Sequence, residues 1–329
     1  MGWLPRVYTG GRTLPRCCAA FLATWFVGSL FYFYNCRICF WGTQNAEALT
    51  PDKAPLIFVG GHESSGTGLL RVLLDVHPLI RCGAEPMVTL TLLEERLGMK
   101  GNLIRRAIKA GIYPEAYDQA VAAFILKVIE KMGPPAPYLC HKQPLTFLYA
   151  KYLGFLFPKA KFVHILRDGR AVTSSLIERG FNPVFTKENA LNGLKQWNQT
   201  VTLLLRQCQE LGVDRCYTII YEKLVMQPEI ETRRLFEFLG IPWDPVVTRH
   251  ETKLKTITNP NPYEPSTRQF MKKIHTKSVD SWAGPKAVLN ETVLKNITAA
   301  CTLLDTLGYT ALGFPPDYTK MNSTVPVIK

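Results

Sequence analysis

A strand, a glycine-rich loop and a helix follow one another over residues 55–77, and this succession restricts the fold more than any other feature. The run PLIFVGG is typical of a buried strand, HESSGTG of a loop, and LLRVLLDVH of an amphipathic helix. Gly61 and Gly66 have the G-x-x-x-x-G spacing of a phosphate-binding loop, where backbone N–H groups and a helix N-terminus surround an anion. Thr67 and Gly68 stand where a nucleoside triphosphatase carries Lys and Ser/Thr, which disfavours ATP or GTP hydrolysis. Taken alone, the loop leaves a strand–turn–helix without a ligand equally open.

Further apolar runs have the length of buried strands, and helical patterns separate them. Strands are expected at 55–61, 138–142, 161–167 and 216–221. Helices are expected at 103–110, 117–132, 145–157, 169–179, 188–212, 230–239 and 285–308. This alternation predicts an α/β fold with a parallel sheet covered by helices on both faces. The polar stretch 253–284 lacks either pattern, and irregular segments of that length are often functional.

A second candidate site is the run Arg167-Asp-Gly-Arg170 at the end of the strand expected at 161–167. Ligands of open α/β sheets bind at the carboxyl ends of the strands, where Arg167 is expected. Ser175 and Arg179 follow with i, i+4 spacing and share a helix face. A guanidinium and a hydroxyl in this position suit a phosphate group, and a surface Arg–Asp network is the alternative.

The N-terminal region contains 20 residues without a charge, from 17 to 36. A helix of that length spans roughly 30 Å, the thickness of a bilayer core. The positive-inside rule places the arginine-containing residues 1–16 in the cytoplasm, which gives a single-pass type II protein. A cleaved signal peptide ending near Ala46-Glu47-Ala48 is the alternative. The expected organisation is a cytoplasmic tail (1–16), a transmembrane signal-anchor (17–36), a lumenal stem (37–54), a catalytic domain (55–318) and a C-terminal tail (319–329).

The formal charge of +13 comes from 39 Lys and Arg against 26 Asp and Glu. Such a surplus favours anionic partners. The basic residues are dispersed along the chain, so nucleic acid is not an expected partner and a small phosphate-rich ligand fits better.

The cysteines and sequons agree with passage through the secretory pathway. The pair Cys36 and Cys39 has CxxC spacing but lies at the membrane edge, so a metal site is not expected. In an oxidising lumen, the five cysteines beyond the anchor predict two disulfides and one odd cysteine. Glycosylation sequons occur at Asn198, Asn290, Asn296 and Asn322.

The order of segments resembles that of the tyrosylprotein sulfotransferases over most of residues 54–318. The resemblance rests on PLIFVGG, the S-G-T loop, LLD-x-HP-x-IRCG, PAPYLC-x-K, LFP-x-AKF, RDGRA, QWN, the two-cysteine hairpin, FL-x-IPW and the pair SW at 281–282. It implies the sulfotransferase fold, a P-loop-like parallel sheet flanked by helices, and a Golgi membrane enzyme. It further implies transfer of sulfate from 3′-phosphoadenylyl sulfate to tyrosine hydroxyls of secretory-pathway proteins, with an acidic sequence context and a homodimer.

The resemblance also implies roles for individual residues. Glu85 corresponds to the base that takes the tyrosine proton, Lys142 to the lysine that neutralises the departing phosphate, and Ser266 to a serine that contacts the donor. The implied donor-binding residues are Ser64, Ser65, Gly66, Thr67, Gly68, Arg167, Ser175, Arg179, Tyr221, Ser266, Thr267 and Lys272.

The resemblance pairs Cys82 with Cys140 and Cys208 with Cys216, and leaves Cys301 unpaired. The first bridge would tie the segment that carries the implied base to the segment that carries the implied lysine.

The sequence departs from the family pattern at several positions. The family's loop has a proline and an arginine where this chain has Glu63 and Ser64, and a threonine in place of Gly68. Other departures are at positions where the family holds acidic substrate residues or the donor, namely Met87, Thr91 and Ser281. These changes predict slower transfer and a weaker preference for acidic acceptors. Two alternatives follow from them: a sulfotransferase with a different acceptor, or a donor-binding pseudoenzyme.

Overall fold

The computed structural model describes residues 49–329 except 181, 259, 265, 266, 268–270, 323 and 329. The predicted cytoplasmic tail, transmembrane segment and most of the stem lie outside the described residues. Within the described part, no helix is both long and apolar enough to cross a bilayer. One compact unit comprises Thr50–Lys329.

The centre of this unit is a five-stranded parallel sheet with the order β2-β3-β1-β4-β5. The strands are β1 (Leu56–Gly61), β2 (Ile80–Cys82), β3 (Tyr138–Lys142), β4 (Lys161–Leu166) and β5 (Cys216–Ile220). All six residues of β1 are buried, as expected of the central strand of a sheet covered on both faces. The predicted parallel α/β fold is confirmed. The edge strand β2 was not predicted, because three residues give too short a pattern to recognise.

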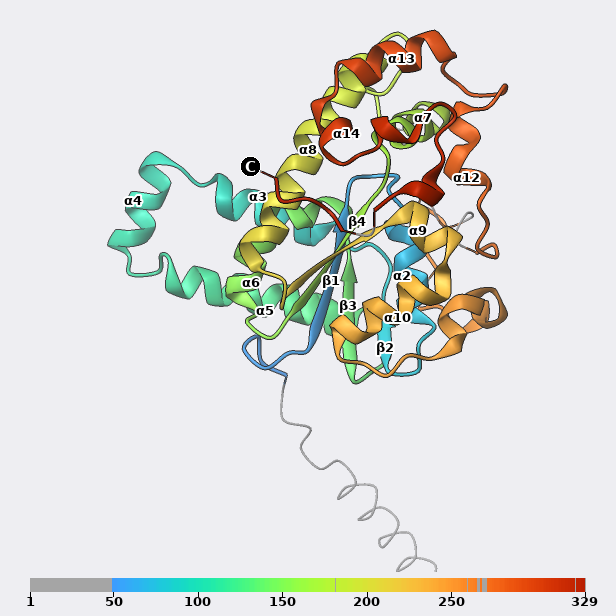
Figure 1. Cartoon of the computed structure of the whole chain (residues 1–329). Coiled ribbons are helices and arrows are strands. Elements are labelled where there is room, and N and C mark those ends of the chain that lie inside the picture. Colours follow the sequence, from blue (N-terminus) through green and yellow to red (C-terminus); the bar gives the residue numbers. More distant parts are fainter. Residues whose placement is uncertain are drawn as a thin grey trace, which may run out of the picture. The chain divides into compact units, whose positions relative to one another are not determined.

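Helices flank the sheet on both sides. In Figure 1, α5, α6 and α8 lie on one side of the strands and α2, α9 and α10 on the other. The helices are α2 (Thr67–Asp75), α3 (Val88–Gly98), α4 (Gly101–Lys109), α5 (Glu115–Lys131), α6 (Ala150–Leu156), α7 (Gly169–Arg179), α8 (Ala190–Leu211), α9 (Tyr221–Met226), α10 (Pro228–Leu239), α12 (Lys277–Asp280), α13 (Glu291–Ala299) and α14 (Thr302–Thr306). Short 3₁₀ helices are η1 (Pro144–Tyr149), η2 (Pro245–Thr256), η3 (Ser281–Ala283), η4 (Thr310–Leu312) and η5 (Tyr318–Lys320).

Helix α7 follows β4 directly, and its ends match the predicted helix at 169–179. The Asp168 carboxylate caps it by accepting a hydrogen bond from the N–H of Arg170, and Gly180 ends it in a left-handed conformation. A Cβ atom at Gly169 would lie 2.5 Å from the Trp197 ring, so α7 and α8 cross closely where α7 begins.

The single helix expected at 285–308 is wrong, because two short helices occupy this stretch. Cys301 between them has an extended backbone, with φ −118° and ψ +95°. The side-chain oxygen of Asn198 in α8 accepts hydrogen bonds from the N–H of Leu303 and the thiol of Cys301. This contact replaces helical hydrogen bonds lost at the break.

Both predicted disulfides are present. Cys82–Cys140 joins opposite residues of β2 and β3, and Cys208–Cys216 joins the end of α8 to the start of β5. Cys301 is buried and forms no disulfide within the described residues. The C-terminal segment, expected as a tail, packs on the domain through Met321, Val325 and Ile328.

Candidate active site

The loop of residues 62–66 joins β1 to α2 and is held by close packing. Gly66 precedes α2 with φ +104°, a conformation that residues with a side chain rarely adopt. A Cβ atom at Gly66 would lie 2.4 Å from the Tyr221 ring, and one at Gly61 would lie 2.6 Å from the carbonyl oxygen of Ile165. Packing therefore requires glycine at both positions. The start of α2 lines a cleft, where its N-terminal N–H groups attract anions.

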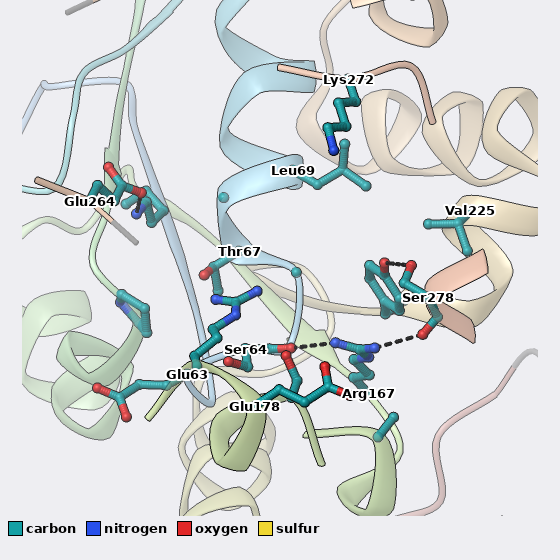
Figure 2. Close-up of a pocket in the computed structure, with 18 of the residues that line it drawn as sticks. Glu63, Ser64, Thr67, Leu69, Arg167, Glu178, Val225, Glu264, Lys272 and Ser278 are labelled. Atoms are coloured by element: carbon teal, nitrogen blue, oxygen red, sulfur yellow. Dashed lines mark hydrogen bonds and ion pairs between the residues drawn. The ribbon is translucent and has the colours of Figure 1, made fainter. Parts of the chain in front are cut away.

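Arg167 connects this loop to a segment more than one hundred residues away. Its guanidinium donates to the carbonyl oxygen of Ser64 at 2.8 Å and to that of Ser278 at 2.7 Å, as Figure 2 shows. The same guanidinium lies over the Tyr221 ring at 4.6 Å from its centroid. The Tyr221 hydroxyl is hydrogen-bonded to the Ser278 hydroxyl at 2.6 Å. These contacts fix the position of Arg167 before any ligand binds.

Several buried polar atoms in this area lack a hydrogen-bond partner among the described residues. Those on residues that line the cleft are the hydroxyls of Ser64 and Ser174 and the Nε of Arg167. Burial first, and then the like charge of Arg167, lower the pKa of Arg179. Unpartnered donors and two neighbouring guanidiniums are costly unless an anion binds between them. The arrangement therefore fits a phosphate-bearing ligand.

The cleft has a volume of about 700 Å³. Its anion end consists of Ser64, Gly66, Thr67, Gly68, Arg167, Tyr221 and Ser278; its carboxylate end consists of Glu63, Glu85, Lys142 and Glu264. Figure 2 shows Glu63 and Glu264 on one side of the pocket and Arg167 and Ser278 on the other. The remaining predicted residues and departures that line the cleft are Met87, Ser175, Arg179, Lys272 and Ser281.

Lys142 is the centre of the carboxylate end. Its Nζ donates to Oε2 of Glu85 at 2.9 Å and to Oε1 of Glu264. Burial raises the pKa of Glu85, Lys142 opposes this effect, and the charges of Glu264 and Glu63 add to it. A carboxylate with a raised pKa is a better proton acceptor, and it lies beside a fixed cation. This end of the cleft is suited to taking a proton from a hydroxyl and stabilising a developing negative charge.

Two side chains of helix α2 bind the backbone of the segments that carry Glu85 and Glu264. The Asp75 carboxylate accepts hydrogen bonds from the N–H groups of Cys82 at 2.6 Å and Thr258 at 2.5 Å. Arg71 donates to the carbonyl oxygens of the same two residues. The disulfide at Cys82 adds a covalent link to β3, two residues before Lys142. The three charged groups therefore rest on a connected buried frame.

A second hydrogen-bond chain positions α3 against β3. His141 and Gln143 both pair with the Thr89 hydroxyl, at 2.8 Å and 2.6 Å, and Gln143 donates to the carbonyl oxygen of Met87. Burial, assisted by the charge of Lys142, lowers the pKa of His141 to about 3, so this ring is neutral. Met87 has φ +60° and is exposed at the rim of the cleft.

The loop offers no cation in place of an arginine at position 64. His62 is buried, its pKa is lowered by burial, and a ring nitrogen is hydrogen-bonded to the carbonyl oxygen of Glu63 at 2.9 Å. The Glu63 carboxylate lines the cleft and accepts a hydrogen bond from the Asn182 amide. Glu63, a departure from the family pattern, therefore adds a third carboxylate to this end of the cleft, beside Glu85 and Glu264.

Two of the predicted residues do not line the cleft, and a third lies outside the described residues. Ser65 belongs to the loop, and its side chain is buried. Thr267 uses its hydroxyl within a turn, by donating to the carbonyl oxygen of Asn261. Ser266 lies outside the described residues.

Sequence reasoning missed Ser278 and Glu264. Neither lies in a motif, and each meets its partner across more than one hundred residues of chain. The only available signal was the irregular stretch 253–284, which contains both.

Comparison with known proteins gives a consistent result. The profile described as "Sulfotransferase family" matches residues 55–245. A protein-tyrosine sulfotransferase of Drosophila melanogaster is 37% identical over 283 residues, covering 83% of this chain and 55% of the relative. Protein-tyrosine sulfotransferase 2 of Gallus gallus is 37% identical over 284 residues, covering 84% and 75%. Protein-tyrosine sulfotransferase A of Caenorhabditis elegans is 34% identical over 275 residues, covering 83% and 72%. The chain thus spans little more than half of the fly relative.

Among solved structures, a sulfotransferase domain from the curacin biosynthetic pathway is similar with a TM-score of 0.52 and 16% identity. The match covers 76% of this chain and 98% of that domain. At this identity the similarity supports the fold alone.

Proposed function

The chain belongs to the protein-tyrosine sulfotransferase family, and from this premise we propose that it transfers sulfate from 3′-phosphoadenylyl sulfate to tyrosine hydroxyls of proteins. The donor's phosphates bind at the anion end, against the N-terminus of α2, Arg167 and Ser175. The unpartnered hydroxyls and the unpartnered Nε of Arg167 support this placement. The tyrosine enters at the carboxylate end.

The chemistry assigns roles to two groups at the carboxylate end, Glu85 and Lys142. The phenol oxygen attacks sulfur and its proton passes to Glu85, while the bond between sulfur and the bridging oxygen of the donor breaks. Negative charge develops on the departing phosphate, and Lys142 stabilises it electrostatically. Sulfate, proton and leaving group are then all accounted for without a further reactant.

The observation that carries this proposal is the contact between Lys142 and Glu85, 57 residues apart in sequence, in the same cleft as Arg167. The direct test mixes the purified protein with radiolabelled donor and a tyrosine peptide. Label should appear on the peptide tyrosine and not on the matched phenylalanine peptide. Absence of transfer, together with a thermal shift in the presence of the phosphoadenosine product, would favour the donor-binding pseudoenzyme instead.

A different acceptor class is favoured by the rim of the cleft. Met87 is exposed where a substrate chain must pass, and Glu63 adds a negative charge to the carboxylate end. An acidic sequence around the tyrosine gains no partner from Met87 and is repelled by Glu63 at short range. Transfer to peptides with acidic, neutral and basic flanks should therefore show weak selectivity for acidic flanks. A steep, salt-resistant acidic preference would contradict this expectation.

The cellular setting is part of the proposal. The protein is anchored in the Golgi membrane by residues 17–36 as a single-pass type II protein, with its catalytic domain in the lumen. It carries glycans on one or more sequons and forms a homodimer. The uncharged N-terminal stretch, the two disulfides and the sequons support this setting. Protease protection in sealed vesicles, glycosidase sensitivity and light scattering of the purified protein test the three parts separately.

A further inference from the structure

Glu264 reaches the reaction centre from a tight turn that its own sequence favours. Asn261 and Pro262 begin the turn, and the Asn261 side-chain oxygen accepts a hydrogen bond from the N–H of Tyr263 at 3.0 Å. The Asn261 carbonyl oxygen accepts from the N–H of Glu264 at 3.1 Å and from the Thr267 hydroxyl at 2.5 Å. As a result Tyr263 is 92% exposed where it lines the cleft, whereas Glu264 is buried and its carboxylate accepts a hydrogen bond from Lys142.

The two carboxylates on Lys142 are not equivalent. The side chains of Lys142 and Glu264 are 1% and 3% exposed, whereas Glu85 is 20% exposed. Only Glu85 is therefore open to an acceptor hydroxyl. Glu264 is enclosed with the lysine and has the position of a permanent counter-ion.

This difference matters during proton transfer. When Glu85 takes the phenol proton, it loses its charge, and Lys142 loses one of its two anionic partners. A buried charge left without a partner is strongly destabilising. With Glu264 in place, Lys142 keeps its proton and its position at the moment when charge develops on the departing phosphate.

We propose that Glu264 is a positioning residue for sulfate transfer, which holds Nζ of Lys142 charged and in place while Glu85 acts as the base. The inference rests on the proposed function. It extends that function to a segment that contacts the reacting atoms only through Lys142.

The charged groups around Lys142 and Glu264 determine how the rate of sulfate transfer should depend on pH if the proposal is right. Glu63 approaches from the phosphate loop and Arg71 from α2, while His141 on β3 is neutral. Removing the charge of Glu264 removes one of the causes that raise the pKa of Glu85. The acid limb of the rate–pH profile, which reports the base Glu85, should therefore move to lower pH.

The experiment compares the wild type, Glu264→Gln, Glu264→Asp and the surface control Glu291→Gln, whose carboxylate pairs with an exposed lysine on α13. Glu264→Gln should lower kcat roughly tenfold to a thousandfold, leave KM for the donor nearly unchanged, and shift the acid limb of the rate–pH profile to lower pH. Glu264→Asp keeps the negative charge on a side chain that is one methylene shorter, so kcat should fall less and the acid limb should stay in place. The control should match the wild type.

Thermal shifts with the phosphoadenosine product show in parallel that each variant folds and binds nucleotide. A Glu264→Gln variant that keeps the wild-type kcat and the wild-type acid limb would overturn the proposal. If that variant does not fold, Glu264→Asp decides, and a wild-type kcat in it would overturn the proposal equally. A wild-type protein that binds the nucleotide product but transfers no sulfate to any tyrosine peptide contradicts the proposed function instead, so the two failures are distinguishable.

Discussion

The anion end of the cleft is built from backbone groups, hydroxyls and the guanidinium of Arg167, whereas the carboxylate end is built from ion pairs. At the anion end, Arg167 is held by two backbone carbonyl oxygens and an aromatic ring, and no carboxylate among the described residues neutralises it by a direct ion pair. At the carboxylate end, Lys142 is already paired with two carboxylates.

This difference separates two kinds of sensitivity. Carbonyl oxygens and hydroxyls do not titrate near neutral pH, so the positive charge of the anion end should not change with pH in this range. An ion pair is lost when its carboxylate takes up a proton. The pH dependence of the rate should therefore arise at the carboxylate end. Substitutions should therefore affect donor binding at one end and turnover at the other.

The strongest test of this separation is Glu85→Ala. Loss of a positioned base should reduce transfer about a hundredfold to ten-thousandfold, because the tyrosine proton has no acceptor. Affinity for the phosphoadenosine product should stay within a factor of about two, since Glu85 lies outside the anion end. Initial rates and calorimetric titration of the same preparation measure both. A variant that keeps most of its rate would mean that another group is the base.

Ser64→Arg tests the border between the two ends. The side chain would bring a cation next to Glu63, where burial keeps His62 neutral. A preorganised cation at a transition state is commonly worth about a hundredfold to a thousandfold in rate, and we expect a gain in that direction. Position 64 already has φ +63° with a side chain, so the exchange adds little backbone strain. A lower rate in the variant would show that this site is organised differently from that of its relatives.

Glu222→Gln tests a buried titratable group next to the anion end, whose carboxylate accepts a hydrogen bond from the N–H of Asp168. Burial, and then the charge of Asp168, raise the pKa of Glu222 to about 7. The folded protein thus holds this proton to higher pH than the unfolded chain does, and the associated stability is lost as pH rises from about 4.5 towards 7 and above. The loss should reach at most about 3 kcal/mol, and it should be missing in the variant. Urea unfolding at pH 5 and pH 8 measures it. Equal pH dependence in both proteins would rule out Glu222 as the source.

Arg167→Ala tests the anion end directly. Each lost charge-assisted hydrogen bond to a phosphate is worth about 1.5–3 kcal/mol, so the Kd of the phosphoadenosine product should rise roughly tenfold to a hundredfold. Arg167→Lys should recover only part of this affinity, because the ammonium cannot span both carbonyl oxygens and a phosphate as the guanidinium can. The rate at saturating donor should change little in either variant. A large loss of kcat with unchanged Kd would contradict the division between the two ends.

The amino-acid sequence by itself determined the local parts of this protein. A contiguous pattern of apolar residues, glycines and a helix encodes the β1–α2 unit, and a strand followed by Asp168 and a helix encodes the position of Arg167. Such features depend on neighbours within a few residues, where periodicity and capping operate. The disulfide pairs and the Glu85–Lys142 pair were available only through resemblance to a family.

The tertiary structure decided how the distant parts meet. Glu264 pairs with Lys142 across 122 residues, and Ser278 binds Arg167 across 111. The three-residue strand β2 exists because Asp75, Arg71 and a disulfide hold it against β3, and the last predicted helix breaks because Asn198 satisfies the groups at the break. These contacts are set by the path of the whole chain and by burial, which removes water as a competing partner. No local sequence pattern determines the path of the whole chain. Glu264 could therefore be assigned to the carboxylate end only from the tertiary structure.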